Sequence, residues 1–410
     1  MTPLDKLRKL SLELYQDIGT KKRWIHVLLE HVYKTGGVYL VGGCVRDAFL
    51  DKPIKDVDIV VDGLSLEEII QELECFGKVD IVGESFSVIK FKPIGHVGEP
   101  FDIAVPRVDR KVGEGHKGFK IETEGVTLLD DLKRRDFTIN SMAYNIFEHE
   151  LIDPFNGQKD LEDKIIRATD STAFIEDPLR ILRGIQFAAR FGFDVDFDTL
   201  ELMRKNAHLI KEITGERIFE EFEKVIKKQG STFATFRLLR MTCIDVHLFG
   251  TTIDTVGKRD LDEITFWFIL GLCSIDDSPA DFLKNRLKAD NKLVKAVATL
   301  DSILIKMHSA FEDDDLRLML SKEFTKAPEV MTSKLLPEEV KEVVKLMDLG
   351  FIPKNFGDVA ITGDTIMEMT GAKGPDVGLW IELLLREALT NKFDWKSVKT
   401  CKEHLIQLME

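Results

Sequence analysis

Short apolar runs alternate with polar stretches over the first hundred residues, which is typical of strands joined by helices and turns. Four apolar residues at 38–41 stand directly before a glycine pair, which predicts a buried strand and a tight turn. Residues 66–76 repeat apolar side chains at helical spacing with glutamates between them, which predicts an amphipathic helix. β-branched runs predict further strands at 56–61, 79–82, 87–91 and 101–105.

From about Phe193 the pattern changes to the period of helices. Apolar pairs one helical turn apart, such as Phe236 with Leu239 and Leu283 with Leu287, alternate with charged residues. The pattern predicts an α+β head, built of a mixed sheet with helices, followed by an all-helical remainder.

Composition narrows the class of protein. A chain of 410 residues with 44% apolar and 31% charged residues is expected to form a soluble protein of several domains. The longest apolar run, 264–273, is too short to span a bilayer, and the first residues do not resemble a secretory leader. Five scattered cysteines favour a reducing compartment, so we expect a cytoplasmic protein with no membrane attachment and no obligate protein partner. The net charge of −14 argues against promiscuous nucleic-acid binding but is compatible with a local basic groove.

The glycine turn is the first candidate site. Gly42 and Gly43 lie between a predicted strand and a predicted helix, an arrangement that directs free N–H groups at an anion. Arg46, one turn into that helix, adds a positive charge. A glycine pair after a strand is also simply a turn, and alone it carries no function.

Paired carboxylates follow this turn. Asp56 and Asp58 are two residues apart on a predicted strand, so both side chains leave the same face and favour a divalent cation, for which Mg²⁺ is well suited. Asp102 stands alone in an apolar strand and is the candidate third ligand. Alone, the pair is more often a solvated strand end, and Asp102 an edge residue facing water. Phosphate cradle and acidic pair together indicate nucleotidyl transfer.

A third cluster lies at 132–143. Arg135 offers donors to phosphate, while Asp136 and Asn140 offer the acceptors and amide that ribose hydroxyls need. An ordinary basic helix start is the structural alternative.

Residues 175–183 offer a base-reading pair. Asp177 and Arg180 lie three apart on a predicted helix, and an acceptor beside a donor matches the edge that cytosine and adenine share. Uracil and guanine present the reverse pair. Asp before Pro178 is equally a standard helix N-cap, so the residues alone leave both interpretations open.

In this order, the motifs resemble the class II tRNA nucleotidyltransferase and bacterial poly(A) polymerase family, within the DNA polymerase β-like superfamily. Residues 153–161 and 215–221 resemble its third and fifth motifs, and 361–363 with 371–378 resemble its tail. The resemblance implies that Asp56, Asp58 and Asp102 are catalytic and bind Mg²⁺. It implies nucleotide binding by Gly42, Gly43, Arg46, Asp47, Arg135, Asp136, Asn140, Asp177, Arg180 and Arg183.

The same resemblance implies a reaction and a division into domains. The expected reaction is addition of CCA to the 3′ end of tRNA from CTP and ATP, with no template. The expected domains are a catalytic head at 1–165, a base-recognising helical neck at 166–228, a helical body at 229–345 and a tRNA-binding tail at 346–410.

Two features qualify this expectation. Gln186 stands where the family usually has Arg, which removes a positive charge associated with nucleotide binding; Arg183 is the candidate to compensate. The basic, glycine-containing stretch 107–120, with His116 as a loop contact, is expected to be a mobile loop that in the family resets the pocket from cytosine to adenine. An A-adding enzyme or poly(A) polymerase, a small-molecule nucleotidyltransferase and a non-catalytic RNA-binding module remain alternatives.

Overall fold

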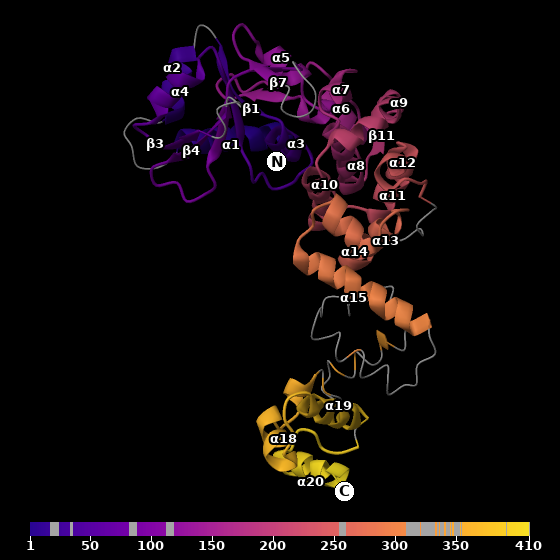
Figure 1. Cartoon of the computed structure of the whole chain (residues 1–410). Coiled ribbons are helices and arrows are strands. Elements are labelled where there is room, and N and C mark those ends of the chain that lie inside the picture. Colours follow the sequence, from indigo (N-terminus) through magenta and orange to yellow (C-terminus); the bar gives the residue numbers. More distant parts are fainter. Residues whose placement is uncertain are drawn as a thin grey trace. The chain divides into compact units, whose positions relative to one another are not determined.

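The computed structural model describes the chain except residues 17–23, 33–35, 82–87, 112–118, 254–259, 391 and 410 and most of 309–354, where it describes only 320, 333, 336, 340, 341, 345, 347 and 353. The chain forms two compact units. The first comprises 1–248 with 252–256, and the second comprises 249–251 with 257–410. Figure 1 shows the elements of both.

A seven-stranded mixed sheet forms the centre of the first unit, in the order β3-β4-β5-β2-β1-β8-β9. Every residue of β1 (Gly37–Val41) is buried, as its apolar run predicts. It pairs antiparallel with β2 (Asp58–Asp62), and β2 runs parallel to β5 (Phe101–Ala104). The predicted sheet and the change to helices are therefore confirmed. β2 begins two residues later than predicted, which leaves Asp56 before the strand.

Helices at the start of the chain pack on this sheet. Helix α2 (Trp24–Val32) buries five side chains, among them Trp24. The indole of Trp24 lies edge-on to the ring of Phe91 at 5.1 Å and stacks on that of Phe101 at 5.5 Å. These ring contacts tie α2 to two neighbouring strands, β4 (Val88–Pro93) and β5.

The predicted amphipathic helix is α4 (Leu66–Leu73), which begins with a capping box formed by Ser65 and Glu68. The remaining elements up to the end of the sheet are α1 (Pro3–Gln16), α3 (Gly43–Phe49), β3 (Gly77–Ile81), α5 (Leu128–Lys133), η1 (Thr138–Asn140), β8 (Ala143–Asn145), β9 (Leu151–Ile152) and α6 (Gly157–Glu162).

The expected loop at 107–120 is wrong at both of its ends. Two strands, β6 (Val108–Lys111) and β7 (Phe119–Glu122), pair antiparallel in full register. The β-branched residues at 108 and 121 favour strands at these positions, and the basic charge of the stretch obscures this signal. His116 and the rest of 112–118 lie outside the described residues.

Three helices pack side by side after the sheet: α8 (Leu179–Phe191), α10 (Gly215–Lys227) and α11 (Thr232–Met241) (Figure 1). One exception to the expected all-helical neck is a short parallel pair of strands, β10 (Ile165–Ile166) with β11 (Asp194–Val195). The other elements here are α7 (Ala173–Glu176), α9 (Phe197–Asn206), η2 (Ala207–Glu212) and α12 (Ile244–Phe249).

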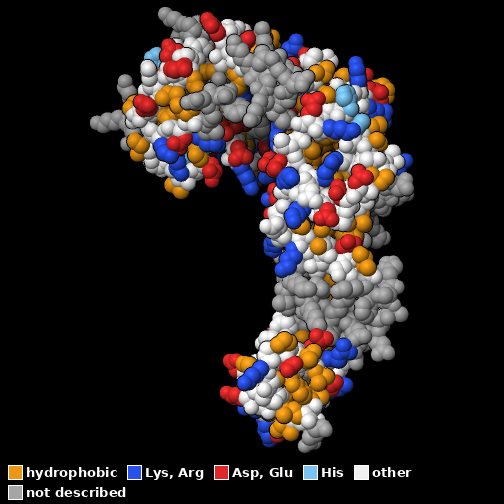
Figure 2. Space-filling model, in the orientation of Figure 1, with side chains coloured by type: hydrophobic (Ala, Val, Ile, Leu, Met, Phe, Trp, Pro, Cys, Tyr) orange, Lys and Arg blue, Asp and Glu red, His pale blue; other side chains and the backbone are white. Residues whose placement is uncertain are grey.

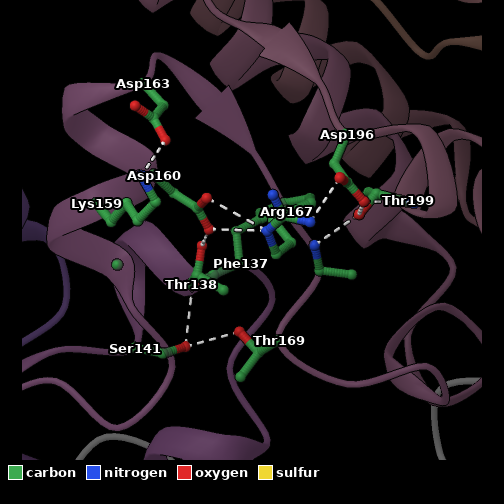
Figure 3. Close-up of polar contacts among 12 residues, drawn as sticks. Phe137, Thr138, Ser141, Lys159, Asp160, Asp163, Arg167, Thr169, Asp196 and Thr199 are labelled. Atoms are coloured by element: carbon green, nitrogen blue, oxygen red, sulfur yellow. Dashed lines mark hydrogen bonds and ion pairs between the residues drawn. The ribbon is translucent and has the colours of Figure 1, made fainter.

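Arg167 clamps the end of the sheet domain to the following helices (Figure 3). Its guanidinium donates to buried Asp160 of α6 through Nε at 3.1 Å and to Asp196 through Nη1 at 2.5 Å. Asp160 also accepts the Thr138 hydroxyl at 2.7 Å, and Asp196 caps α9 by accepting the Thr199 amide. One side chain thus links α6 to the N-cap of α9.

The second unit is helical in its described residues. Its elements are α13 (Glu263–Leu272), α14 (Pro279–Asp281), the π-helical turn η3 (Phe282–Arg286), α15 (Asn291–His308), η5 (Phe356–Asp358), α18 (Gly363–Thr370), α19 (Pro375–Leu389) and α20 (Val398–Met409). None of the helices built from described residues combines the length and apolar character needed to cross a membrane.

Gly184 gives a direct test of the packing beneath α8. A Cβ at this position would lie 2.3 Å from the Met203 Cε and 2.8 Å from the Phe137 Cζ. Met203 is flexible, but the Phe137 ring is fully buried and cannot yield easily. We expect Gly184→Ala to reduce the free energy of unfolding by about 1–3 kcal/mol, measured by calorimetry. Gly378→Ala, in open space within α19, should instead stabilise by about 0.5–1 kcal/mol. Equal effects of the two substitutions would contradict this packing.

Candidate active site

Two of the predicted acids lie next to each other because their strands are paired. Asp58 at the start of β2 is in direct register with Asp102 on the parallel neighbour β5. Asp56 is exposed and immediately precedes β2. The sheet therefore brings together carboxylates that are 44 positions apart in the sequence, which the sequence alone does not reveal.

The surroundings of Asp58 disfavour its charged form. Burial raises the pKa of its carboxyl above the ordinary value, with further increases from Asp102 and Asp56, against a lowering by Arg135. Lys90 on β4 donates to Asp102 at 2.8 Å, and this ion pair partly neutralises the cluster. Asp58 is thus a half-buried carboxylate whose charge is only partly balanced by neighbouring side chains.

A hard divalent cation suits this set of donors, because carboxylate oxygens crowded at one strand edge repel one another unless a cation lies between them. In the part of the chain that the structure describes, no three Asp, Glu, His or Cys side chains are arranged to hold a metal ion together. Asp102 is engaged by Lys90, so Asp58 with Asp56 is the pair that fits a cation best.

Glycine is required at the turn after β1. Gly42 has a φ of +69°, and a Cβ there would lie 2.6 Å from the Arg135 Nη1. The amide of Gly42 donates to the Met142 carbonyl at 3.3 Å. The turn therefore serves a structural purpose: it lets the Arg135 guanidinium approach the backbone beside Asp58.

Arg135 is held in place by a buried acid. The fully buried Asp131 accepts from the Arg135 Nη2 at 2.9 Å and from the Arg134 Nη2 at 2.6 Å. Burial alone would raise the pKa of Asp131, but Arg135 and Arg134 hold it below the ordinary value. Two guanidinium groups thus share the Asp131 carboxylate, which fixes the position of both.

A buried polar chain connects α3, η1 and α8. Arg46 donates to the Asn140 Oδ1 at 2.6 Å, and the Asn140 amide donates to the Asp136 Oδ1 at 2.9 Å. Arg183 of α8 donates to the other Asp136 oxygen through Nε at 2.7 Å. Asp47 pairs with Arg46 at 2.7 Å. Several residues predicted to bind the nucleotide therefore form hydrogen bonds or ion pairs with one another.

These hydrogen bonds and ion pairs set the charge state of Asp136. Burial would raise the pKa of its carboxyl, but Arg183, Asn140 and Arg180 lower it below the ordinary value. Asp136 in turn raises the pKa of Arg183. The pair is fully ionised at neutral pH.

The predicted base-reading pair lies at the start of α8, where the contacts of Asp177 support its capping interpretation and its base-reading role stays a prediction. Its Oδ1 accepts the Leu179 amide at 3.2 Å, so it caps the helix, although it precedes the helix rather than lying on it. Arg217 of α10 lies 3.6 Å from the same carboxylate. Arg180 is buried, and its Nη1 lies 3.8 Å from the Glu176 carboxylate without a hydrogen-bond partner among the described residues.

A cavity of about 400 Å³ collects these side chains. A second cavity of about 500 Å³ borders it and shares Asp58, Arg46, Arg183 and Gly43. Of the predicted residues, Asp47 and Asp56 line only the second cavity and Asp102 lines neither. The first is lined by the ten others: Gly42, Gly43, Arg46, Asp58, Arg135, Asp136, Asn140, Asp177, Arg180 and Arg183.

Sequence reasoning missed several lining residues. Arg134 and Arg217 line the first cavity, and each lies inside a motif that the sequence singles out without assigning it a role. Lys52 and Arg190 line the second cavity, beside Gln186, which is buried there. Their only sequence signal is positive charge near the paired acids and at the end of α8.

Comparison with known proteins defines the class. Residues 38–167 match the poly A polymerase head domain, and residues 192–249 match a probable RNA- and SrmB-binding site of polymerase A. The chain is 41% identical over 192 residues to a CCA-adding enzyme of Blochmanniella floridana and 41% identical over 209 residues to a multifunctional CCA protein of Haemophilus ducreyi. These alignments cover 46% and 50% of this chain, and 44% and 48% of the relatives. The chain therefore matches about half the length of these relatives.

Solved structures share the fold. The CCA-adding enzyme of Bacillus stearothermophilus in complex with CTP aligns with a TM-score of 0.70 at 23% identity, over 95% of this chain and 98% of that one. The Thermotoga maritima enzyme complexed with tRNA aligns with a TM-score of 0.71 at 24% identity, over 98% of each chain.

The first unit contains a nucleotidyltransferase head, as its sheet, its paired acids and the matched head domain indicate. This fold indicates dependence on a divalent metal ion. Over about half of its length the chain is similar to CCA-adding enzymes, and within that part residues 38–167 match the poly A polymerase head domain.

The Asp136–Arg183 pair predicts a loss of stability on substitution. Asp136→Asn leaves the half-buried Arg183 without its counter-charge, so we expect the free energy of unfolding to fall by about 1–3 kcal/mol at pH 7, measured by urea titration. The folded pKa is depressed, so this contribution is present at higher pH and is lost as pH falls below about 4. The difference between variant and parent should shrink there.

Asp163→Asn is the matched control, because it breaks only the exposed pair with Lys159 (Figure 3) and should cost less than about 1 kcal/mol. A cost for Asp136→Asn no larger than this control would show that the pair is not structurally important.

Proposed function

We propose that this chain is a template-independent tRNA nucleotidyltransferase that adds CCA to tRNA 3′ ends from CTP and ATP with Mg²⁺. The observation that carries the proposal is the position of Asp58, at the junction of two cavities, one of which also holds Asp177 and Arg180. An acid that suits a cation and a donor–acceptor pair that suits cytosine or adenine thus face one cavity of nucleotide size. The relatives named as CCA-adding enzymes support this assignment.

Asp56, Asp58 and Asp102 are the proposed metal ligands. Mg²⁺ supplies Lewis-acid stabilisation of the triphosphate charge and activation of the attacking hydroxyl when it is bound. Asp102 would have to exchange its contact with Lys90 for the ion. The raised pKa of Asp58 favours this role, because a cation relieves the cost of its buried charge.

The nucleotide is proposed to lie in the first cavity. Arg180 and Asp177 both line the cavity, so a guanidinium donor and a carboxylate acceptor stand at the same wall. Asp177 is proposed to accept an amino group and Arg180 to donate to a ring nitrogen, as cytosine and adenine require. Arg135, positioned by Asp131 over Gly42, is proposed to contact the phosphates.

Asp136 and Asn140 are proposed to act mainly by positioning. Both Asp136 oxygens and the Asn140 side chain are already engaged by Arg183, by Arg46 and by each other. A ribose hydroxyl can share these acceptors, but the existing contacts fix the orientation of Arg183 towards both cavities.

In the proposed reaction the RNA 3′-hydroxyl loses its proton to water and its oxygen bonds to the α-phosphorus. The bond between the α-phosphorus and the bridging oxygen breaks, and pyrophosphate leaves with the electron pair. The proposed domain roles are a catalytic head at 1–165, a base-reading neck at 166–228, a body at 229–345 and a tRNA-binding tail at 346–410. We further propose a cytoplasmic location.

A second candidate is an A-adding enzyme or poly(A) polymerase on the same scaffold. Both matched family models are described in terms of polymerase A, which favours keeping this alternative. The two activities differ in whether C is incorporated and in the length of the A tract.

The discriminating assay supplies tRNAs that end before, within and after the CC sequence, with labelled CTP or ATP. CCA addition predicts C incorporation on the first two and a single A on the third. Incorporation of A alone would favour an A-adding enzyme, and long A tracts on unrelated RNA would favour the polymerase. No incorporation on any RNA would contradict the proposed function.

Asp58→Ala should abolish incorporation, by at least about a thousandfold in kcat, because it removes the carboxylate shared by both cavities. Binding of tRNA in a filter assay should stay within about twofold, because the tRNA contacts are proposed to lie elsewhere. Asp80→Ala, an exposed acid on β3, is the control and should retain activity. Turnover by the Asp58 variant comparable to that of the control would refute the metal assignment.

A further inference from the structure

The second cavity is more basic than the proposed function accounts for. Seven basic side chains line it against three aspartates, and the aspartates include the proposed metal ligands at one end. On the face drawn in Figure 2, both signs of charge are interspersed over the described residues. The lining of this cavity differs, because basic side chains outnumber acidic ones there. Its lining includes Lys52, Lys55, Arg190, Lys224 and Lys228.

Three of these cations gather on one aromatic ring. Lys52 Nζ lies 4.4 Å from the centroid of the Phe191 ring, and the guanidinium carbons of Arg190 and Arg46 lie at 4.8 and 5.1 Å. The three come from separate parts of the chain: Arg46 from α3, Lys52 from the segment after it, and Arg190 from the end of α8. Phe191 therefore holds together charges that would otherwise repel one another.

Asp47 is the carboxylate that compensates this cluster among the described residues, and it is engaged by Arg46. Arg46 is paired with Asp47, but neither Lys52 nor Arg190 forms an ion pair with any described acid. Burial lowers the pKa of Lys52, with a further lowering by Arg190, and burial with Arg46 likewise lowers the pKa of Arg190. An anion placed among these groups would relieve both costs.

Building on the proposed function, we propose that the Phe191 cluster is the binding site for the pyrophosphate portion of the nucleoside triphosphate, with Lys52 and Arg190 as direct ligands and Phe191 as their positioning residue. Two phosphates joined in one compact group carry three or more charges, which matches three cations around one ring. RNA phosphates carry one charge each and are spread along the strand, so they match this cluster less well.

The position of the cluster agrees with this assignment. Asp58 borders both cavities, so a nucleotide whose base lies by Asp177 can place its α-phosphate at Asp58 and extend its β- and γ-phosphates into the second cavity. Arg183 and Arg46 line both cavities and would accompany the chain of phosphates across the junction.

Phe191 is itself rigidly held. Its ring stacks on that of Phe187 at 5.8 Å with an interplanar angle of 4°, and it packs against that of Phe193 at 5.6 Å. Phe187 in turn lies beneath Arg46 and Arg183 at 5.4 and 5.2 Å. An aromatic face at position 191 is therefore the feature that keeps Lys52 and Arg190 together.

Calorimetric titration of the full chain with inorganic pyrophosphate, at fixed ionic strength and without RNA, tests the site directly. Lys52→Gln and Arg190→Gln should each weaken pyrophosphate binding by about five- to tenfold. Lys227→Gln is the matched control, because this lysine neighbours Lys228 on α10 but pairs with Glu223 outside the cavity, and its affinity should equal that of the parent. Unchanged affinity in both cavity variants would overturn the proposal.

The role of Phe191 is tested by two substitutions. Phe191→Leu keeps most of the apolar volume but removes the aromatic face, so it should weaken pyrophosphate binding several-fold. Phe191→Tyr keeps the aromatic face, so its pyrophosphate affinity should equal that of the parent. A purely packing role would predict loss of thermal stability without this difference in affinity. Equal pyrophosphate affinity in the two variants would rule out the positioning role.

Steady-state kinetics separate this site from one for the acceptor strand. Lys52→Gln should raise the KM for CTP and leave the KM for tRNA unchanged; the reverse result would assign the cavity to RNA phosphates and refute the proposal. Because pyrophosphate binding is measured without turnover, its loss or retention is independent of whether the chain incorporates C.

Discussion

The ion pair between the buried Asp136 and the half-buried Arg183 is the constraint on which the rest of the site depends. It connects the segment between α5 and η1 to the helix that carries Arg180 and follows Asp177. Asn140 donates to Asp136 and accepts from Arg46, so these hydrogen bonds extend the connection to Arg46 beside the glycine turn. A largely desolvated pair of this kind contributes less through its own attraction than through the cost of separating its members. It therefore fixes the helix that carries the proposed base-reading residues relative to the glycine turn.

Asp58 lines both cavities of the site, and the two cavities differ in their side chains. On one side of Asp58 a cavity offers a selective donor–acceptor pair, and on the other a cavity offers a cluster of cations. The proposed selectivity for a base thus belongs to the first cavity and the proposed affinity for phosphates to the second. Arg183 lines both cavities, so we expect a change in its contact with Asp136 to affect base selection and phosphate binding together.

Much of the fold follows from local pattern, and much of the site does not. The apolar run at 38–41 and the later helical period predict β1 and the helices because burial and periodicity are local properties. The register of Asp58 with Asp102 depends on which strands pair, and that depends on the whole sheet. The ribbon of β6 and β7 was missed because its charged residues resemble those of a solvated loop. Residue types at Arg46, Asp136 and Asn140 indicate polar partners without saying whether the partner is a ligand or another side chain.

The most direct test of the central claim is a crystal structure of the chain with CTP and Mn²⁺ in place of Mg²⁺, with the metal located by its anomalous signal. The account predicts manganese bound by the Asp58 carboxylate and the cytosine edge against Asp177 and Arg180. Manganese bound away from Asp58, or a cytosine that does not contact this pair, would contradict it.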